Sequence, residues 1–414
     1  MERCEAMKKI DCLLVGGGPA GLAAAVELYS LGVRDMLIVE REKSLGGILR
    51  QCIHDGFGLS RFGESLSGPE YASRFIRRVE ELGIPYLTEA AVIHISPEKV
   101  VTIASREGLL TYEAKTIVLS MGCRERTRGA LAIPGERPAG VFTAGVAQAY
   151  MNLYNRMPAR EAVILGSGDI GMIMARRLTL EGCHVKGVYE VLPYPSGLPR
   201  NVLQCLDDYG IPLHLSHTVT CVHGEKRLEG VTVSKVDENL RPVAGTEEYV
   251  PCDTLILSVG LIPENELSLD AGVLLDNRTR GAVVDEHLQT SVDGVFAAGN
   301  VLHVHDLVDF VSEEAERLAG SVHAYLEKGS LKRGELAITC GTGVHHTVPQ
   351  LLTGKEKAVL SLRVKKPMEE VTITARQGES LIGKKKLKKA LPAQMIELTV
   401  DPVSDSLPVE VSVE

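Results

Sequence analysis

Hydrophobic positions near the N-terminus predict a strand, a turn, a helix and a second strand, in that order. Residues 11–15 form a short apolar run that is typical of a buried strand. A glycine-rich stretch follows at 16–21, and residues 22–32 then have the apolar spacing and alanine content of a helix. A second apolar run at 35–39 ends at an acidic residue, Glu40.

The glycines of this turn have the spacing of a dinucleotide-binding fold. Gly16, Gly18 and Gly21 form a G-x-G-x-x-G, and Glu40 follows Gly16 by 24 residues. The first glycine allows the tight turn, the second lets the backbone approach a pyrophosphate, and the third lets the helix lie close to the strand. The helix N-terminus offers unpaired N–H groups to the phosphates, and the acid can accept hydrogen bonds from ribose hydroxyls.

The same pattern recurs in the middle of the chain. An apolar strand at 162–165 leads into Gly166, Gly168 and Gly171, then a helix at 172–182, and a strand at 184–190 that ends in Glu190. The acid again follows the first glycine by 24 residues. Two complete units of this kind predict two dinucleotide sites in one chain.

The acid of the second unit favours NAD over NADP. A 2′-phosphate about 4 Å from Glu190 would be repelled by about 4 kcal/mol per unit charge at an effective dielectric near 20. No arginine follows Glu190 until Arg200 to offset this repulsion. The sequence therefore predicts NADH rather than NADPH as the second ligand.

Composition and charge narrow the class of protein. The chain has 414 residues, enough for roughly two or three domains, and its net charge of −9 argues against a nucleic-acid partner. The apolar stretch at 10–33 is interrupted by glycines, Pro19 and Glu27, so no transmembrane segment is expected. Nine scattered cysteines without a C-x-x-C are typical of free thiols in a reducing cytoplasm, where we expect the protein to be.

The residue types and their spacing change after residue 330. Short runs rich in β-branched residues, separated by glycine and proline, predict a small β-rich module at 331–414. Within it, the lysine-rich run at 384–389 is interpreted as a solvated strand end or turn.

Three further motifs give the chain a family resemblance. Ser120 and Gly122 end an apolar strand, residues 253–265 form a second strand that leads to a glycine, and residues 290–300 read TSVDGVFAAGN. Together with the two glycine turns, they resemble the two-dinucleotide flavoproteins of the thioredoxin-reductase-like pyridine nucleotide-disulfide oxidoreductase superfamily. Asn300 stands where most of those relatives carry aspartate. The resemblance covers residues 8–330.

This resemblance implies an α/β fold with two Rossmann-like domains and the C-terminal β-rich module. The FAD domain is predicted at 1–139 and 256–330, the inserted NAD domain at 140–255, and the module at 331–414. A helix at 308–326 is expected to aim its N-terminus at the flavin. The residues implied to contact FAD are Gly16, Gly18, Pro19, Ala20, Gly21, Glu40, Arg41, Gly47, Ser120, Gly122, Gly299, Asn300, Phe310 and Val311. Those implied to contact NAD are Gly166, Gly168, Asp169, Ile170, Gly171, Glu190 and Gly260.

The stretch GGILRQCIHDGFG at 46–58 holds a single cysteine where disulfide reductases of this superfamily carry a pair. Without a dithiol, electrons would leave the flavin directly, to a quinone, a dye, oxygen or a partner protein. Cys52 and His54 are the catalytic candidates, and a buried apolar role is favoured for Cys52. The histidines at 303, 305, 345 and 346 show no ligand set with matched spacing, so no metal site is predicted.

Within the superfamily the chain resembles the alpha subunits of hydrogen cyanide synthase and of opine and proline dehydrogenases. It also resembles oxidoreductases that accompany an anaerobic-type glycerol-3-phosphate dehydrogenase. These imply an FAD-dependent, diaphorase-like enzyme that passes electrons between NADH, flavin and a partner dehydrogenase or electron-acceptor subunit, and we expect an oligomer. The alternatives are an amine- or opine-type dehydrogenase or oxidase with its own substrate, and a flavin-bearing assembly subunit without turnover. The direction of electron flow stays open.

Overall fold

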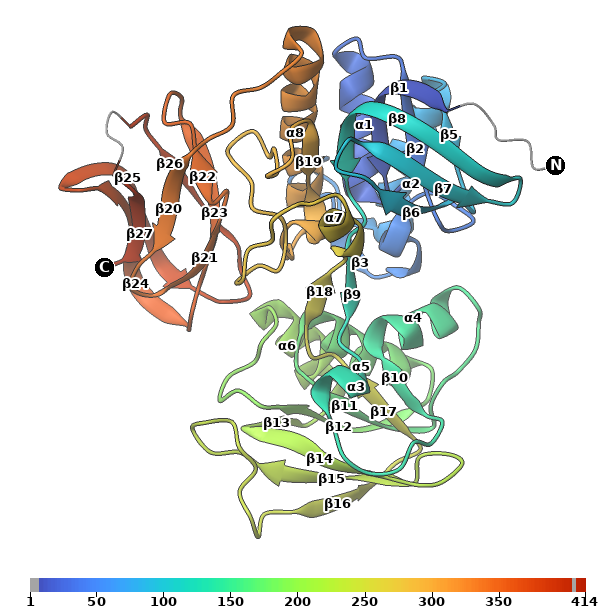
Figure 1. Ribbon diagram of the computed structural model, residues 1–414. Helices are drawn as coiled ribbons and strands as arrows, with labels where there is room; N and C mark the ends of the chain where they lie inside the picture. The colour runs from blue at the N-terminus through green and yellow to red at the C-terminus, as the bar shows by residue number, and fades with distance from the viewer. Residues whose placement is uncertain (1–6, 404–406) are drawn as a thin grey trace. The chain divides into compact units, whose positions relative to one another are not determined.

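The computed structural model describes residues 7–403 and 407–414, and Figure 1 shows its helices and strands. Contacts divide the chain into two compact units, one formed by residues 1–123 and 263–414 and the other by residues 124–262. The sequence-based boundaries at 139/140 and 255/256 differ from this division. They fall within or beside strands β10 (Val141–Thr143) and β17 (Thr254–Leu257), which pair with each other inside the second unit.

The first unit is built on a seven-stranded sheet in the order β5-β2-β1-β8-β7-β6, with β19 beside β8. Its strands are β1 (Lys8–Val15), β2 (Met36–Val39), β5 (Tyr86–Leu87), β6 (Ala91–Ile95), β7 (Val100–Ser105), β8 (Gly108–Leu119) and β19 (Val295–Ala297). β1 runs parallel to β2 and β8, and β19 runs parallel to β8. Ligands of open parallel sheets bind at the carboxyl ends of the strands, so this edge is the place to look for a site.

Helices α1 (Pro19–Ser30) and α8 (Val308–Lys328) pack side by side in this unit. Three consecutive alanines, Ala23, Ala24 and Ala25, are fully buried in α1, and their small side chains allow close packing. Both predicted helices are confirmed. The remaining elements of the region are η1 (Gly47–Gln51), β3 (Asp55–Phe57), β4 (Leu66–Ser67), α2 (Gly68–Glu81), α7 (Glu266–Asp270) and η3 (Gly299–Val301).

The second unit holds a five-stranded parallel sheet in the order β10-β17-β11-β12-β13. Its other parallel strands are β11 (Glu161–Leu165), β12 (His184–Glu190) and β13 (Leu213–Leu215). An antiparallel sheet is formed by β14 (His217–His223), β15 (Gly230–Lys235) and β16 (Glu248–Pro251). The helices are α3 (Arg128–Leu131), α4 (Ala144–Asn152), α5 (Asp169–Leu180), α6 (Pro199–Cys205) and η2 (Asp207–Tyr209). β9 (Cys123–Glu125) and β18 (Leu261–Pro263) pair where the chain passes between the units.

The C-terminal segment forms two sheets around a hydrophobic core of its own, as the β-rich prediction requires. One sheet has the order β22-β20-β27-β24-β25 and the other β21-β23-β26. Their bounds are β20 (Leu336–Cys340), β21 (Val344–Val348), β22 (Leu351–Leu352), β23 (Ala358–Val364), β24 (Met368–Gln377), β25 (Ser380–Ala390), β26 (Ile396–Val400) and β27 (Val409–Val413).

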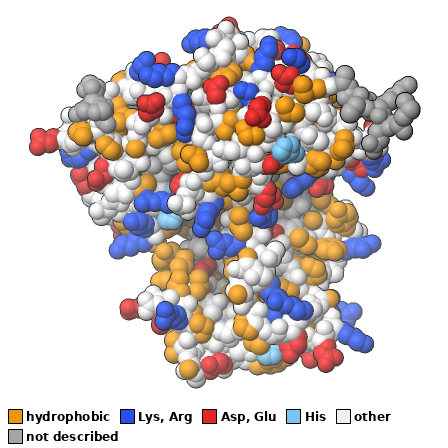
Figure 2. All heavy atoms as spheres, viewed as in Figure 1, with side chains coloured by type: hydrophobic (Ala, Val, Ile, Leu, Met, Phe, Trp, Pro, Cys, Tyr) orange, Lys and Arg blue, Asp and Glu red, His pale blue; other side chains and the backbone are white. Residues whose placement is uncertain are grey.

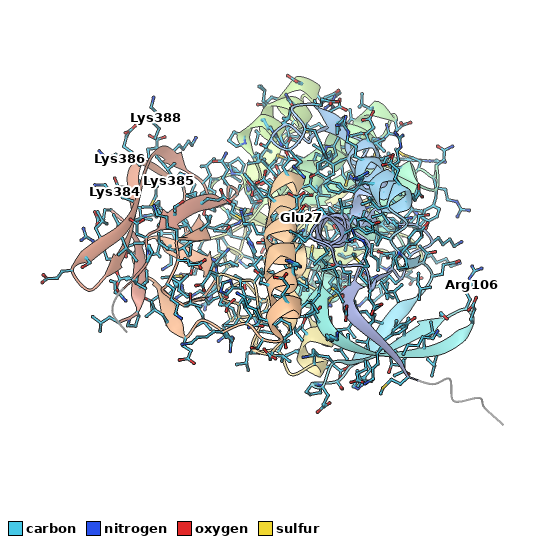
Figure 3. The ribbon with its side chains drawn as sticks, turned by 90° about the horizontal axis from the view of Figure 1, so that it is seen from above. Glu27, Arg106, Lys384, Lys385, Lys386 and Lys388 are labelled. Carbon is cyan, nitrogen blue, oxygen red and sulfur yellow. The ribbon has the colours of Figure 1, made fainter. Side chains whose placement is uncertain are left out.

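The lysine-rich run at 384–389 lies inside β25 rather than at a strand end or turn, which corrects the sequence interpretation. β25 comes last in the order of its sheet, and charged side chains are tolerated there because they hinder pairing with another chain. Figure 3 shows the side chains of Lys384, Lys386 and Lys388 projecting away from the module. On the face shown in Figure 2, lysine, arginine and acidic side chains are interspersed with apolar ones.

The β module is hydrogen-bonded to the rest of its unit. The Asp285 carboxylate accepts a bond from the Gly334 N–H at 2.9 Å, and Arg278 Nη1 donates to the His345 carbonyl at 2.9 Å. Val348 belongs to the same hydrophobic core as the large sheet. Deleting residues 331–414 would therefore expose this core as well as remove the module.

Candidate functional site

The first glycine turn leaves no room for side chains. Gly16 has φ +110°, and a Cβ there would lie 2.5 Å from the carbonyl oxygen of Ser120. A Cβ on Gly21 would lie 1.9 Å from the Gly16 carbonyl oxygen. Because these two glycines lack side chains, the start of α1 can lie against the ends of β1 and β8. A pyrophosphate at a helix N-terminus requires this arrangement.

Glu40 lies at the end of β2 with its carboxylate buried beside this turn. Oε2 accepts the Gly17 N–H at 2.8 Å, and Oε1 accepts the Glu42 N–H at 2.8 Å. A carboxylate offers about four acceptor positions. Two are therefore left to receive the hydroxyls of a ribose.

Four separate segments of the chain meet at this edge of the sheet. A Cβ on Gly47 would lie 3.0 Å from the Cα of Gly18, and one on Gly299 would lie 3.0 Å from the Cβ of Ala20 and 3.3 Å from Val311. The structure thus brings together most of the residues predicted to contact FAD. Of the others, Pro19 is at the start of α1, Phe310 is half-buried in the first turn of α8, and Ser120 is buried. Arg41 is exposed, and Gly122 has φ +76° with open space around it.

Sequence reasoning missed Asp309, which is buried in the first turn of α8. Its two carboxylate oxygens accept the N–H groups of Gly58 at 3.0 Å and Ser60 at 3.1 Å. An acid in the first turn of a helix is favoured by the helix dipole. This acid ties the 46–58 stretch to α8, and the only local signal for it was its place in that first turn.

Asn300 bonds within its own loop. Its Oδ1 accepts the backbone N–H of His305 at 3.0 Å, and its Nδ2 lies 3.6 Å from the sulfur of Cys123. The side chain that replaces the usual aspartate therefore organises residues 300–305. Its predicted contact with a flavin stays a prediction.

Cys52 follows η1, and its Sγ lies 3.4 Å from the Ile48 carbonyl oxygen. His54 lies beside Phe57, with ring centroids 4.8 Å apart. Burial raises the pKa of the Cys52 thiol to about 12. No disulfide joins any two of the eight cysteines within the described ranges.

We expect Cys52→Ser to leave the catalytic rate of the protein within about twofold of the parent. A thiol with a pKa near 12 is only about one part in ten thousand thiolate at pH 8, so it is a poor nucleophile. Alkylation of this residue by iodoacetamide, followed by mass spectrometry, should accelerate about tenfold per pH unit up to pH 10 without a plateau. A plateau below pH 8, together with a large rate loss in Cys52→Ser, would show a catalytic thiol instead.

The second glycine turn has the same close geometry. Gly166 has φ +97°, and a Cβ there would lie 2.1 Å from the Ser258 carbonyl oxygen. A Cβ on Gly171 would lie 2.7 Å both from the Gly166 carbonyl oxygen and from Ser258 Cβ. Gly168 precedes α5, whose first residues are Asp169 and Ile170, and Gly260 has φ +100°. The predicted NAD residues of this turn therefore lie together at the carboxyl ends of β11 and β17.

Glu190 differs from Glu40 in how many bonds it already accepts. Its Oε2 receives the Ser167 N–H at 2.9 Å and the hydroxyls of Ser167 and Ser196 at 2.6 and 2.8 Å. Its Oε1 receives the Leu192 N–H at 3.0 Å. The hydroxyls of Ser167 and Ser196 occupy acceptor positions of the Glu190 carboxylate that ribose hydroxyls could use. An incoming ribose would therefore have to replace these two donors.

The loop at 192–198 lies over the start of α5. The Leu198 N–H donates to Asp169 Oδ1 at 2.8 Å, and Asn201 Nδ2 donates to the same oxygen at 2.6 Å. A Cβ on Gly197 would lie 2.9 Å from the Asp169 backbone nitrogen. Asp169 therefore anchors the proline-containing loop, and glycine is needed at 197 for this approach.

Comparison with known proteins supplies the family. The sequence pattern of the family described as pyridine nucleotide-disulphide oxidoreductase matches residues 10–324, which is most of the chain. The chain belongs to this family. The match spans both glycine turns and ends within α8.

Among curated relatives, the hydrogen cyanide synthase subunit HcnB of Pseudomonas aeruginosa is 26% identical over 340 residues, covering 75% of this chain and 69% of that protein. An opine oxidase subunit of Agrobacterium tumefaciens is 26% identical over 349 residues, covering 78% of this chain and 66% of that protein. The resemblance to these two subunits is confirmed. The resemblance to oxidoreductases that accompany a glycerol-3-phosphate dehydrogenase stays a prediction.

Among solved structures, thioredoxin reductase of T. acidophilum matches with a TM-score of 0.62 at 23% identity, covering 77% of this chain and 98% of that chain. L-proline dehydrogenase of P. horikoshii matches with a TM-score of 0.54 at 20% identity, covering 80% of this chain and 58% of that chain. At such identities the likeness shows the fold alone, and it confirms the predicted α/β class with two Rossmann-like domains.

The family supports FAD-dependent oxidoreduction with a pyridine nucleotide. The residues of this chain fit FAD at the first turn, since a Cβ on Gly16 or Gly21 would close the approach to the helix and Glu40 keeps acceptor positions free. Among the described helices, none has both the length and the apolar character needed to span a bilayer.

Proposed function

We propose that the protein oxidises NADH at the second unit and delivers electrons, through FAD held by the first unit, to an acceptor outside the chain. The observation that supports this most is the pair of glycine turns, each with a buried acid at the end of the next strand. FAD accepts a hydride and can release electrons singly or in pairs. The protein would supply binding, orientation and exclusion of water.

The first unit would hold FAD through backbone N–H groups and through the carboxylate of Glu40. Gly18 and the N-terminus of α1 would face the pyrophosphate, and Glu40 would take the adenosine ribose. The first turn of α8, at Phe310 and Val311, would direct backbone N–H groups and a partial positive charge toward the flavin ring. Asp309 would act as a positioning residue, because its bonds to Gly58 and Ser60 hold the 46–58 stretch beside this helix.

The second unit would prefer NADH to NADPH. The Glu190 carboxylate is buried, and the three neutral donor groups of Ser167 and Ser196 converge on its Oε2. A 2′-phosphate beside it would meet a negative charge with no arginine supplied by residues 191–199. Partial exposure in the complex would reduce the repulsion of about 4 kcal/mol, but its sign would still favour NADH.

The acceptor would be a partner subunit or a dehydrogenase that docks with this chain. Two of the curated relatives are named as subunits, one of hydrogen cyanide synthase and one of opine oxidase, which supports a multi-subunit assembly. No disulfide relay is needed in this scheme, because electrons would leave the first unit without passing through a dithiol.

Anaerobic stopped-flow mixing with NADH tests the proposal. We expect the yellow flavin band to bleach within seconds, and NADPH at the same concentration to bleach it at least about tenfold more slowly. Reoxidation by a dye or quinone should restore the band. Protein that keeps its flavin but is not bleached by either nucleotide would overturn the proposal, and would favour a subunit that oxidises its own amine or opine substrate or serves assembly alone.

A further inference from the structure

Two histidines and a glutamate outside the dinucleotide turns converge beside α8. His303 and His305 follow η3, and Glu314 lies in the second turn of α8. One ligand atom from each residue can be chosen such that all three lie within 4.8 Å of one another. Their side chains are 1%, 2% and 3% exposed. The sequence showed no such set, because Glu314 stands apart from the HVHD run and only the start of α8 brings it back.

The hydrogen bonds around His305 fix which of its nitrogens carries the proton. Asn300 Oδ1 accepts the backbone N–H of His305 at 3.0 Å, and since that N–H can only donate, the amide orientation is settled. The same oxygen lies 3.3 Å from His305 Nδ1. Nδ1 therefore donates to Asn300, and in the neutral ring Nε2 carries a lone pair.

That lone pair faces another acceptor. His305 Nε2 lies 3.4 Å from Glu314 Oε2, yet it has no hydrogen-bond partner anywhere in the described residues. Two acceptors held face to face in a buried place repel each other, and either a proton on Nε2 or a metal ion between the two atoms removes this repulsion. His303 Nε2 lies 2.9 Å from the same carboxylate oxygen.

The spacing and the donor types fit a metal ion. Ligands at 2.0–2.1 Å from a tetrahedral zinc lie about 3.3 Å from one another. His305 Nε2 is 3.4 Å and His303 Nε2 is 2.9 Å from Glu314 Oε2, so metal binding would require the His303 ring to move away by a few tenths of an ångström. Two imidazoles and one carboxylate form the ligand set of catalytic zinc sites and of non-haem iron(II) sites that keep open positions.

The surrounding bonds would orient these ligands. The Gly299 N–H donates to Glu314 Oε1 at 2.7 Å, so that Oε2 faces the two imidazoles, where a metal ion would lie. Asn300 accepts a hydrogen bond from Nδ1 of His305, the ring nitrogen that would not bind the metal, and so orients the imidazole. Arg363 Nη2 lies 3.5 Å from Asp306 Oδ1, whereas the partners of Glu314 Oε2 are the two imidazoles, so a metal ion would lie between the carboxylate and these rings.

We propose that His303, His305 and Glu314 form a site for one divalent first-row transition metal ion, Zn²⁺ or Fe²⁺, with at least one position left for water or a substrate oxygen. None of the three ligands belongs to a glycine turn, although Gly299, which donates to Glu314, packs against Ala20 of the first turn. The proposal rests on these three side chains and not on the function proposed above. The site joins the loop after β19 to α8.

Metal analysis of the untagged holoprotein tests the proposal. Protein purified without chelators should carry close to one equivalent of Zn²⁺ or Fe²⁺ by inductively coupled plasma mass spectrometry. After removal of the metal with a chelator, Co²⁺ should add visible bands to the long-wavelength side of the flavin spectrum and saturate at one equivalent. The identity of the native metal separates the zinc and iron forms of the proposal.

Loss of a residue that only orients a metal ligand typically lowers metal affinity by about 10–100-fold. His305→Ala removes a ligand itself and should weaken Co²⁺ binding by more than this. His345→Ala is the matched control, because His345 contacts His346, whose ring lies 6.4 Å from that of His303, but is not one of the three ligands. It should bind Co²⁺ as the parent does, and far-ultraviolet circular dichroism should show that both variants are folded. Equal loss in the two variants would overturn the proposal. Should His305→Ala not fold, the parent titration decides alone, and absence of one-to-one Co²⁺ binding would overturn it.

Discussion

Gly21→Ala is expected to yield protein that is nearly colourless, with FAD affinity lowered by about 100-fold or more. The added methyl would lie 1.9 Å from the carbonyl oxygen of Gly16, a backbone atom that cannot move without shifting the turn. α1 would have to retreat from β1, and overpacking of this kind costs about 1–3 kcal/mol or more. That energy would be taken from FAD binding, since each 1.4 kcal/mol is about a tenfold change in affinity.

The measurement is the ratio of bound flavin to protein after gel filtration, followed by titration with added FAD. Gly320→Ala is the matched control, because Gly320 is an exposed glycine inside α8 whose added methyl would meet open space. That change should raise the free energy of unfolding by about 0.5–1 kcal/mol and leave FAD binding intact. Gly21→Ala protein that retains full flavin would contradict the placement of the pyrophosphate at this turn.

Glu190→Gln is expected to raise KM for NADH by about 10–100-fold while the flavin content stays normal. The amide nitrogen would face hydrogen-bond donors, either the Ser167 N–H and the two serine hydroxyls or the Leu192 N–H. Hydrogen bonds to a charged group contribute about 1.5–3 kcal/mol each, so losing the charge and one acceptor accounts for this range. Because the ribose is remote from the reacting atoms, kcat should change little.

The same variant should narrow the preference for NADH. Removing the negative charge removes its repulsion of a 2′-phosphate, so the ratio of KM values for NADPH and NADH should fall by at least about tenfold. Glu238→Gln, an exposed change in the same unit, serves as the control and should leave both KM values unchanged. A ratio that does not move in Glu190→Gln would show that the acid is not at the ribose.

The two glycine turns were predictable because every part of them is local. Gly16 and Glu40, or Gly166 and Glu190, are 24 residues apart, and the strand, turn and helix between them follow from apolar spacing and glycine placement. The same reasoning misjudged the lysine run at 384–389. Its lysines are compatible with a strand only because β25 lies at the edge of its sheet, and edge position is a property of the assembled fold.

By itself, the sequence determined the two dinucleotide units, the absence of a C-x-x-C pair and the β-rich texture of the C-terminal segment, because each rests on residue type and short-range spacing. Only the tertiary structure decided that Asp309 bonds to Gly58, 251 residues away, and that His305 faces Glu314 across the start of α8. Those contacts depend on which strand ends and helix starts meet at one edge of a sheet. The packing of the whole core decides which of these ends lie together, and short-range sequence patterns do not contain that information.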